Sequence, residues 1–287
     1  MTSPESSQSS DFIPELPTKR PYALTVASSD SGGGAGIQAD LKTMTRLGAY
    51  GGSVVVAVTA QHTRGVDSTY VLPDEEIRAQ FDAVVGDFDV GAIKLGMLAA
   101  ASAVEVVDDC LRAYDGPVVL DPVMVATSGD PLLEDDAVDA YTRLFERATL
   151  LTPNADEVER LTGAYPDDER SRAEAAETLF GWGADAVLFK GGHVDTGANA
   201  VRDTLVTRER VVEFTNPRVQ TERTHGSGCT LSSAIASRLA HGDELSTAVE
   251  RGIEFTHATI THPADVGRGP GSVDHLAGST RWDGALR

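Results

Sequence analysis

Short apolar runs alternate with longer stretches of helical periodicity from Pro21 onward, and this alternation constrains the fold more than any other feature. The expected strands are 22–27, 53–60, 91–95, 117–120, 149–151 and 186–189. Several are rich in Val, Ile and Leu at successive positions, which is typical of parallel strands buried on both faces. The alternation therefore predicts a doubly wound α/β sheet, in which ligands bind at the carboxyl ends of the strands.

The intervening segments have the periodicity and the end signals of helices. They are 36–47, 73–85, 100–113, 135–146, 169–182, 228–240 and 246–260. In the first, Ile37, Leu41 and Met44 fall on one face. Gly48 is expected to end that helix in a left-handed conformation. A two-stranded excursion over 201–214 is predicted before the last two helices.

The charge balance restricts the possible partners. The 287 residues include 44 Asp and Glu against 24 Lys and Arg, for a net charge of −20. Only Lys19, Lys42, Lys94 and Lys190 are lysines. A strongly negative surface repels nucleic acid and anionic membranes, so neither is an expected partner. The favoured interpretation is adaptation to high salt, and the alternative is an acidic interaction face.

Targeting signals and disulfide patterns do not occur in the sequence. Residues 1–20 are rich in Ser, Pro and Glu without the apolar core of a signal peptide, and they predict a disordered leader. No apolar run approaches the length of a membrane span. Cys110 and Cys229 are far apart and have neither framework nor metal-site spacing. A soluble, cytoplasmic protein is expected.

The first glycine-rich segment, 28–36, joins a strand to a helix. Its glycines would let backbone N–H groups approach a ligand at the positive end of a helix dipole. The spacing matches neither a Walker loop nor a dinucleotide fingerprint. By itself the segment is equally compatible with a tight turn.

The second glycine-rich segment, 224–230, precedes the helix expected over 228–240. Gly226, Gly228 and Cys229 at a helix start would gather unpaired N–H groups around one point, which predicts an anion hole. The helix N-terminus is expected to lower the pKa of the Cys229 thiol. The alternative is a buried structural cysteine, the interpretation that we give to Cys110.

Two further segments have polar residues at strand ends. Asn154 and Glu157 follow the strand at 149–151 and could hold a hydrated Mg²⁺, or they could form a helix cap. Lys190 follows the strand at 186–189 and precedes two glycines, where its point charge suits a nucleotide phosphate. The alternative is a surface lysine, which is disfavoured because lysine is so rare in this chain.

Six runs together resemble one known family. They are 33–43, 47–51, 94–98, 119–126, 128–133 and 224–232. In this order they resemble the motifs of the hydroxymethylpyrimidine/phosphomethylpyrimidine kinases of thiamin biosynthesis, over residues 22–275. The resemblance implies a ribokinase-like three-layer αβα sandwich with a mostly parallel sheet, forming a single domain over 21–287. It also implies a homodimer.

The same resemblance implies the reaction and the substrate site. Such enzymes use MgATP to phosphorylate the hydroxymethyl group of an aminopyrimidine and then the resulting monophosphate. Gln61 matches the residue that hydrogen-bonds the pyrimidine, and a primary amide offers both a donor and an acceptor for this purpose. Asp40 and Met97 match other residues of the pyrimidine pocket.

Further residues are assigned to ATP and to catalysis by the resemblance alone. The residues expected to serve MgATP are Asn154, Glu157, Lys190 and Asp121, of which Glu157 and Asp121 would hold Mg²⁺ through water. Gly226 and Gly228 would form the anion hole. Cys229 stands where ribokinase relatives have an aspartate base, a feature shared with the related pyridoxal kinases.

Two departures and three alternatives accompany this assignment. The loop 28–32 differs from the usual family sequence, and Thr127 replaces a common lysine. The main alternative is a pyridoxal kinase of the same architecture, against which Gln61 beside Met97 favours the aminopyrimidine. A catalytically silent ligand sensor is another alternative, but the sequence contains no DNA-binding element, extra partner domain or disrupted phosphate loop that would support it. A dehydrogenase lacks the acidic residue that binds ribose in such folds.

Overall fold

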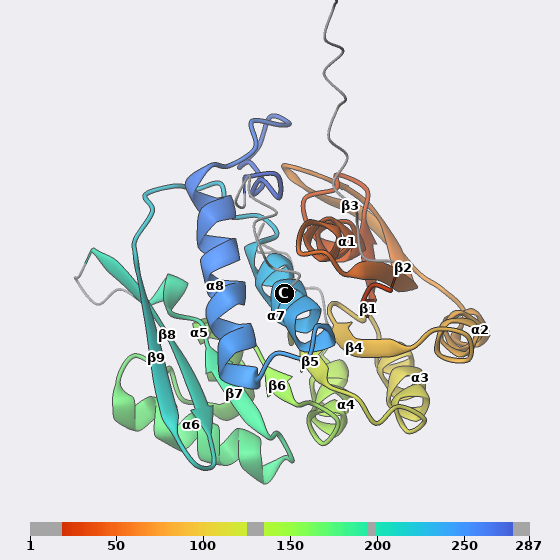
Figure 1. Ribbon diagram of the computed structural model, residues 1–287, viewed down its shortest axis with the longest axis horizontal. Coiled ribbons are helices and arrows are strands. Elements are labelled where there is room, and N and C mark those ends of the chain that lie inside the picture. Colours follow the sequence, from red (N-terminus) through yellow and green to blue (C-terminus); the bar gives the residue numbers. More distant parts are fainter. Residues whose placement is uncertain (1–18, 125–134, 195–198, 278–287) are drawn as a thin grey trace, which may run out of the picture.

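The strands of the protein form one continuous sheet. The computed structural model describes residues 19–124, 135–194 and 199–277. Within these ranges a nine-stranded sheet has the order β3-β2-β1-β4-β5-β6-β7-β8-β9 (Figure 1). The strands are β1 (Tyr22–Asp30), β2 (Tyr50–His62), β3 (Gly65–Val71), β4 (Val90–Leu95), β5 (Val118–Leu120), β6 (Leu150–Leu151), β7 (Ala186–Phe189), β8 (Ala200–Thr207) and β9 (Val211–Pro217). Pairing is parallel from β2 to β7, and β3, β8 and β9 are antiparallel.

Helices cover both faces of this sheet (Figure 1). They are α1 (Gly36–Arg46), α2 (Asp74–Val85), α3 (Ala101–Leu111), α4 (Asp135–Phe145), α5 (Ala155–Thr162), α6 (Glu169–Gly181), α7 (Ser227–Ala240) and α8 (Leu245–Thr261), with a short 3₁₀ turn at Gly191–His193. Successive residues of β1 face opposite layers, as expected for a strand. Ala23 packs with Met44 of α1, whereas Leu24 packs in the cluster that includes Phe81 of α2. Because α7 and α8 pack on the α1 side, the molecule has three layers.

The predicted α/β architecture is confirmed, whereas the edge strand β3 was not predicted. All six predicted strands occur, with β1 and β2 longer than expected, and the excursion over 201–214 is the β8–β9 hairpin. Gly48 has the expected left-handed backbone, with φ of 80°. The unpredicted β3 is a mostly exposed edge strand with few apolar residues, so its sequence has no buried-strand pattern. The helix α5 was foreseen only as one interpretation of the Asn154 segment.

Some expectations concern residues outside the described ranges. These are the leader up to residue 18, the substitution at Thr127 and the run 128–133. Within the described ranges, no helix combines the length and apolarity that crossing a membrane requires. Both cysteines are free thiols, and Cys110 lies in the core as expected.

Candidate active site

The predicted site residues follow the carboxyl ends of neighbouring parallel strands. Asp121 comes directly after β5, Asn154 shortly after β6, and Lys190 directly after β7. In an open parallel sheet these ends meet along one edge, which is where ligands bind. The start of α7 at Ser227 faces the same edge, because a Cβ atom added to Gly228 would lie 3.2 Å from Asp121 Oδ2.

A lysine and two carboxylates form the centre of the site. Lys190 Nζ lies 2.9 Å from Asp121 Oδ1 and 3.9 Å from Glu157 Oε2. Thr152 Oγ1 donates a 3.1 Å hydrogen bond to Asp121 Oδ1. Burial by itself would lower the pKa of Lys190, but the charges of Asp121 and Glu157 outweigh it and raise the pKa above its ordinary value. Lys190 is therefore an ammonium ion held between carboxylates, beside the start of α7.

The Asn154 segment forms the helix cap that was one of its two interpretations. Asn154 Oδ1 accepts a hydrogen bond from the Glu157 N–H at 2.9 Å, and Glu157 Oε2 accepts one from the Asn154 N–H at 2.7 Å. This reciprocal capping box fixes the Glu157 carboxylate at the start of α5. Burial raises the pKa of Glu157 to about 7, although Lys190 opposes the shift. The cap is compatible with binding of a hydrated Mg²⁺ by Glu157, because it holds the Glu157 carboxylate at the centre of the site, 3.9 Å from Lys190 Nζ.

Two glycines lie at the start of α7, and a close backbone contact requires the first of them. Gly226 has φ of 83° and is the N-cap of α7, with no side chain capping the helix. A Cβ atom at Gly226 would overlap the carbonyl oxygen of Gly34 in the first glycine-rich loop. A Cβ atom at Gly228 would lie 3.2 Å from Asp121 Oδ2 and 3.5 Å from Lys190 Nζ, so Gly228 adjoins this ion pair. The uncapped N–H groups at this helix start are suited to bind an anion.

The predicted pKa shift of Cys229 is wrong in direction. Burial raises the pKa of the Cys229 thiol to about 11, and the charges of Asp40 and Asp121 add to the rise. The Lys94 ammonium and a hydrogen bond from the Gly36 N–H lower it, but by less. The sequence analysis favoured the effect of the helix N-terminus over the alternative of a buried cysteine, and burial has the larger effect on this pKa. The thiol is therefore protonated at neutral pH.

Two of the residues assigned to the pyrimidine lie against the first glycine-rich loop. The backbone carbonyl of Met97 accepts hydrogen bonds from Ser28 Oγ at 2.8 Å and from the Ser28 N–H at 2.9 Å. The carbonyl of Gln61 accepts a 2.8 Å hydrogen bond from Ser31 Oγ. The Gln61 side chain is partly buried, and its Oε1 accepts a 3.1 Å hydrogen bond from Thr59 Oγ1. The loop therefore brings the ends of β2 and β4 together.

Asp40, the third residue assigned to the pyrimidine, is buried among the elements that meet near Cys229. The side chains of Asp40 and Lys94 are fully buried, and Lys94 Nζ lies 2.8 Å from Asp40 Oδ2. Asp40 also accepts hydrogen bonds from Thr25 and from Ser233, one turn after Cys229 in α7. Its carboxylate is thus occupied in joining α1, β1, β4 and α7. The contact of Asp40 with a pyrimidine therefore stays a prediction from the resemblance.

Lys94 is the main site-supporting residue that sequence reasoning missed. It stands inside the apolar run at 91–95, where a buried lysine requires a partner of opposite charge. The rarity of lysine in this chain is a further signal, and in the sequence analysis it was used for Lys190 only. Burial by itself would lower the pKa of Lys94, but the nearby charge of Asp40, with smaller contributions from Cys229 and Asp121, outweighs burial and raises the pKa.

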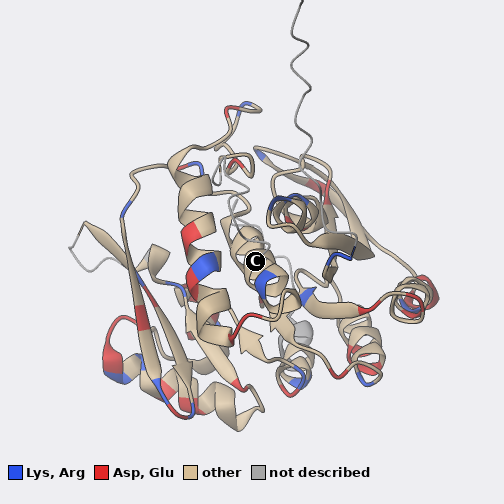
Figure 2. Ribbon diagram, viewed as in Figure 1, with Lys and Arg blue, Asp and Glu red and all other residues tan. Residues whose placement is uncertain are grey.

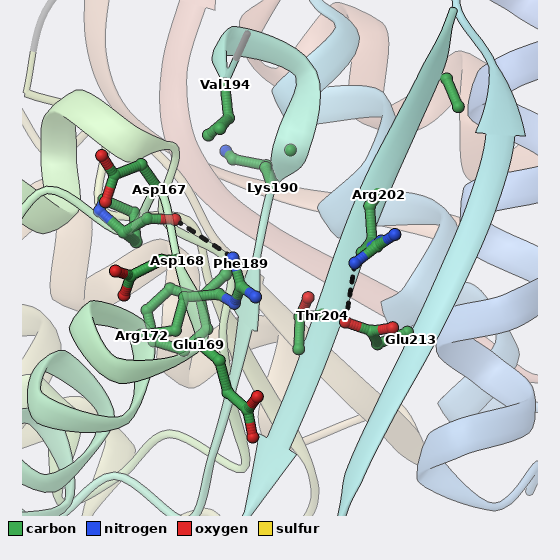
Figure 3. Close-up of a pocket in the computed structure, with 13 residues that line it drawn as sticks. Asp167, Asp168, Glu169, Arg172, Phe189, Lys190, Val194, Arg202, Thr204 and Glu213 are labelled. Atoms are coloured by element: carbon green, nitrogen blue, oxygen red, sulfur yellow. Dashed lines mark hydrogen bonds and ion pairs between the residues drawn. The ribbon is translucent and has the colours of Figure 1, made fainter. Parts of the chain in front are cut away.

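A hollow lies beside Lys190 on the α6 side of the sheet (Figure 3). Its volume is about 420 Å³, and Arg172, Arg202 and Thr204 are among the residues that line it. Leu205 packs with α7 and α8, so Arg202 and Thr204 point away from α7. Four carboxylates also line this hollow, from Asp167, Asp168, Glu169 and Glu213. They would repel phosphates, which are better accommodated at the start of α7.

The fold and the site together define a small-molecule kinase of the αβα type. The family model described as phosphomethylpyrimidine kinase matches residues 30–274. The chain belongs to this family.

Individual relatives agree with this family assignment. A hydroxymethylpyrimidine/phosphomethylpyrimidine kinase of Streptomyces coelicolor is 46% identical over 263 residues, which cover 91% of this chain and 97% of that protein. The crystal structure of phosphomethylpyrimidine kinase from Clostridium difficile is 38% identical, with a TM-score of 0.73 over 84% of this chain and 99% of that one. An ADP complex of Bacillus subtilis pyridoxal kinase is 30% identical, with a TM-score of 0.82 over 90% and 98% of the two chains. The predicted family and fold class are therefore confirmed.

Proposed function

We propose that this kinase transfers the γ-phosphoryl group of ATP to the hydroxymethyl group of 4-amino-5-hydroxymethyl-2-methylpyrimidine, and then phosphorylates the monophosphate to the diphosphate used in thiamin synthesis. The observation that carries the proposal is the meeting of the Lys190 cluster with the uncapped start of α7. The loop that contacts the backbones of Gln61 and Met97 also donates the Gly36 N–H to Cys229. The substrate alcohol and the phosphate donor can therefore meet at the start of α7, between the Lys190 cluster and the first glycine-rich loop.

MgATP is the proposed phosphoryl donor. Solved pyridoxal kinases of the same fold bind ADP or AMP-PCP, which supports an adenine nucleotide as the cofactor. Lys190 would bind the phosphates as a point charge, with Asn154 at the adjoining helix cap. Among the described residues, no group of three or more His, Cys, Asp or Glu side chains could hold a metal by itself. Glu157 and Asp121 would hold Mg²⁺ through water, a mode usual for this ion, and Mg²⁺ would neutralise charge on the phosphates.

The residues at the start of α7 would act on the transferring group. The N–H groups near Gly226 and Gly228 can meet the negative charge that accumulates during transfer. Cys229 is the proposed acceptor of the alcohol proton. Because burial raises the pKa of this thiol, proton acceptance requires a prior deprotonation that becomes easier as the pH rises.

The aminopyrimidine is preferred over pyridoxal as the substrate. Curated relatives named hydroxymethylpyrimidine/phosphomethylpyrimidine kinase are 40–46% identical, whereas the solved pyridoxal kinases are 28–30% identical. The separate thiamin biosynthesis bifunctional protein of Geobacter sulfurreducens is 47% identical. The deciding experiment is a steady-state competition between the two alcohols. We expect the larger kcat/KM for the aminopyrimidine, and a larger value for pyridoxal would overturn the assignment.

A homodimer is the proposed assembly. Val58 of β2 is 44% exposed and Tyr70 of β3 is 65% exposed, and the two residues are paired across the strands at the edge of the sheet. Exposed apolar side chains in neighbouring positions favour association. Analytical ultracentrifugation of a Val58→Ser/Tyr70→Ser variant should show a shift towards monomer. A wild-type monomer would contradict this proposal.

The proposed setting is a reducing cytoplasm at high salt. Both cysteines are free thiols, as is usual in reducing compartments. Carboxylates are spread over the outer helices and turns, including the start of α2 at Asp74, Glu75 and Glu76 (Figure 2). Such a surface repels itself at low ionic strength and is screened at high ionic strength.

A further inference from the structure

The carboxylate of Asp30 organises the first glycine-rich loop. It accepts hydrogen bonds from the N–H groups of Gly32 at 2.8 Å, Gly34 at 3.0 Å and Ala35 at 2.8 Å. His225 Nε2, from the segment before α7, lies 3.1 Å from Asp30 Oδ2. Burial opposes the charged form, but His225 and the backbone N–H groups outweigh burial and lower the pKa of Asp30. Asp30 is therefore a carboxylate shared by two loops.

The loop held by Asp30 contacts the start of α7 at two points. The Gly36 N–H lies close enough to the Cys229 thiol to favour its thiolate form, although burial has the larger effect on the pKa of this thiol. The carbonyl of Gly34 lies against Gly226 so closely that no Cβ fits. Ser272 Oγ, from the C-terminal segment, donates to the Gly34 carbonyl at 3.4 Å. The loop, the anion hole and the cysteine therefore form one connected unit.

We propose that Asp30 and His225 are positioning residues for Cys229. Their contact holds the glycine-rich loop against α7, and so keeps the Gly36 N–H directed at the thiol. Neither residue needs to touch the substrate for this effect. Small displacements of reacting groups cost large factors in rate, so loss of the pair should lower kcat more than it raises KM. The activity readout rests on the proposed function, whereas the reactivity of the thiol does not.

Three variants of the full chain test the proposal. Asp30→Asn removes the charge, His225→Ala removes the partner, and His225→Gln keeps a side-chain amide that can reach Asp30. We expect kcat to fall about 10- to 10²-fold in the first two variants, with small changes in KM for ATP. The alkylation of Cys229 by iodoacetamide at alkaline pH should slow in both, because the displaced Gly36 N–H no longer favours the thiolate. Peptide mass spectrometry separates Cys229 from Cys110. His225→Gln should retain a higher kcat and a faster alkylation of Cys229 than His225→Ala.

A second histidine–aspartate pair provides the matched control. His62 Nε2 lies 3.5 Å from Asp67 Oδ2 on the exposed β2–β3 hairpin, so Asp67→Asn should leave kcat and alkylation unchanged. The double variant Asp30→Asn/His225→Ala should be no worse than the more impaired single variant, because the two residues act as one unit. Wild-type kcat in both single variants, or reduced kcat with wild-type alkylation of Cys229, would overturn the proposal.

The outcomes also separate this inference from the choice of substrate. An enzyme that acts on another alcohol would show weak activity on the aminopyrimidine even as wild type, while the alkylation comparison would remain valid. Thermal denaturation identifies any variant that fails to fold. If Asp30→Asn fails, the comparison of His225→Gln with His225→Ala decides the matter, since equal alkylation rates at the wild-type value would contradict the proposal.

Discussion

Replacing Lys94 by Met should destabilise the protein more than any surface charge substitution. The variant leaves the Asp40 carboxylate fully buried without the ammonium that lies 2.8 Å away. Thr25 and Ser233 still donate to the carboxylate, but neither supplies a positive charge. Breaking a buried ion pair by removing one partner typically costs about 3–5 kcal/mol. In a protein of this size each kcal/mol lowers Tm by about 2–4 °C, so a fall of roughly 6–20 °C is expected.

Equilibrium urea denaturation and thermal scans measure this effect. The double variant Lys94→Met/Asp40→Asn removes both charges and should recover at least about 2 kcal/mol relative to Lys94→Met alone, as expected for coupled neighbours. Lys19 provides the control, since it forms a lysine–aspartate pair with Asp89 in which both side chains are 87% exposed. Lys19→Met should leave the unfolding free energy unchanged. The reasoning is refuted if Lys94→Met is as stable as wild type, or if the double variant is no more stable than the single one.

Four further predictions concern substrate binding, catalysis and the surface. Gln61→Leu leaves ligand polar groups unpaired at a cost of about 1–3 kcal/mol, so KM for the pyrimidine should rise while KM for ATP stays the same; an unchanged pyrimidine KM would remove Gln61 from the site. Cys229→Ala should lower kcat about 10²- to 10⁴-fold, and Cys229→Asp should retain more activity, whereas wild-type kcat in both would leave Cys229 a packing residue. Because the pKa of the Cys229 thiol is about 11, wild-type kcat should increase with pH from neutral towards that value, and a flat profile would contradict proton acceptance by this thiolate. Tm should rise from low to molar KCl as screening relieves carboxylate repulsion, and a constant Tm would contradict adaptation to salt.

The parallel centre of the sheet could be predicted because its strands are buried on both faces. Strands such as β7 are apolar at every position, so their boundaries follow directly from the sequence. The edge strand β3 could not be found in this way, because it is held by pairing with β2 and mostly faces solvent. Its existence depends on a partner strand and not on its own pattern. The same limit applies to the length of β2, which extends two residues beyond the predicted end at residue 60.

The site was predictable in its backbone parts and less so in its charges. Gly226 and Gly228 predict an anion hole from the sequence, and the close approach of the Gly34 carbonyl leaves no room for a side chain at Gly226. The pKa of Cys229 could not be predicted, because its direction depends on burial produced by segments distant in the sequence. The family resemblance assigned Asp40 to the pyrimidine pocket. Only the three-dimensional contacts show that its carboxylate forms an ion pair with Lys94.

The distribution of lysine connects the surface to the site. Arginine supplies most of the positive charge on this acidic protein: only four of the 24 basic residues are lysine, and the other 20 are arginine. Three of the four lie at or beneath the site. Lys190 is held between Asp121 and Glu157, Lys94 pairs with Asp40, and Lys42 Nζ donates a 2.7 Å hydrogen bond to the Gly33 carbonyl of the glycine-rich loop. At these positions a compact ammonium on a flexible stem fits where a planar guanidinium would need more room. The rarity of lysine, together with the positions of three lysines, therefore points to the candidate active-site end of the sheet. Lys190→Arg should bind ATP less well than wild type despite the retained charge.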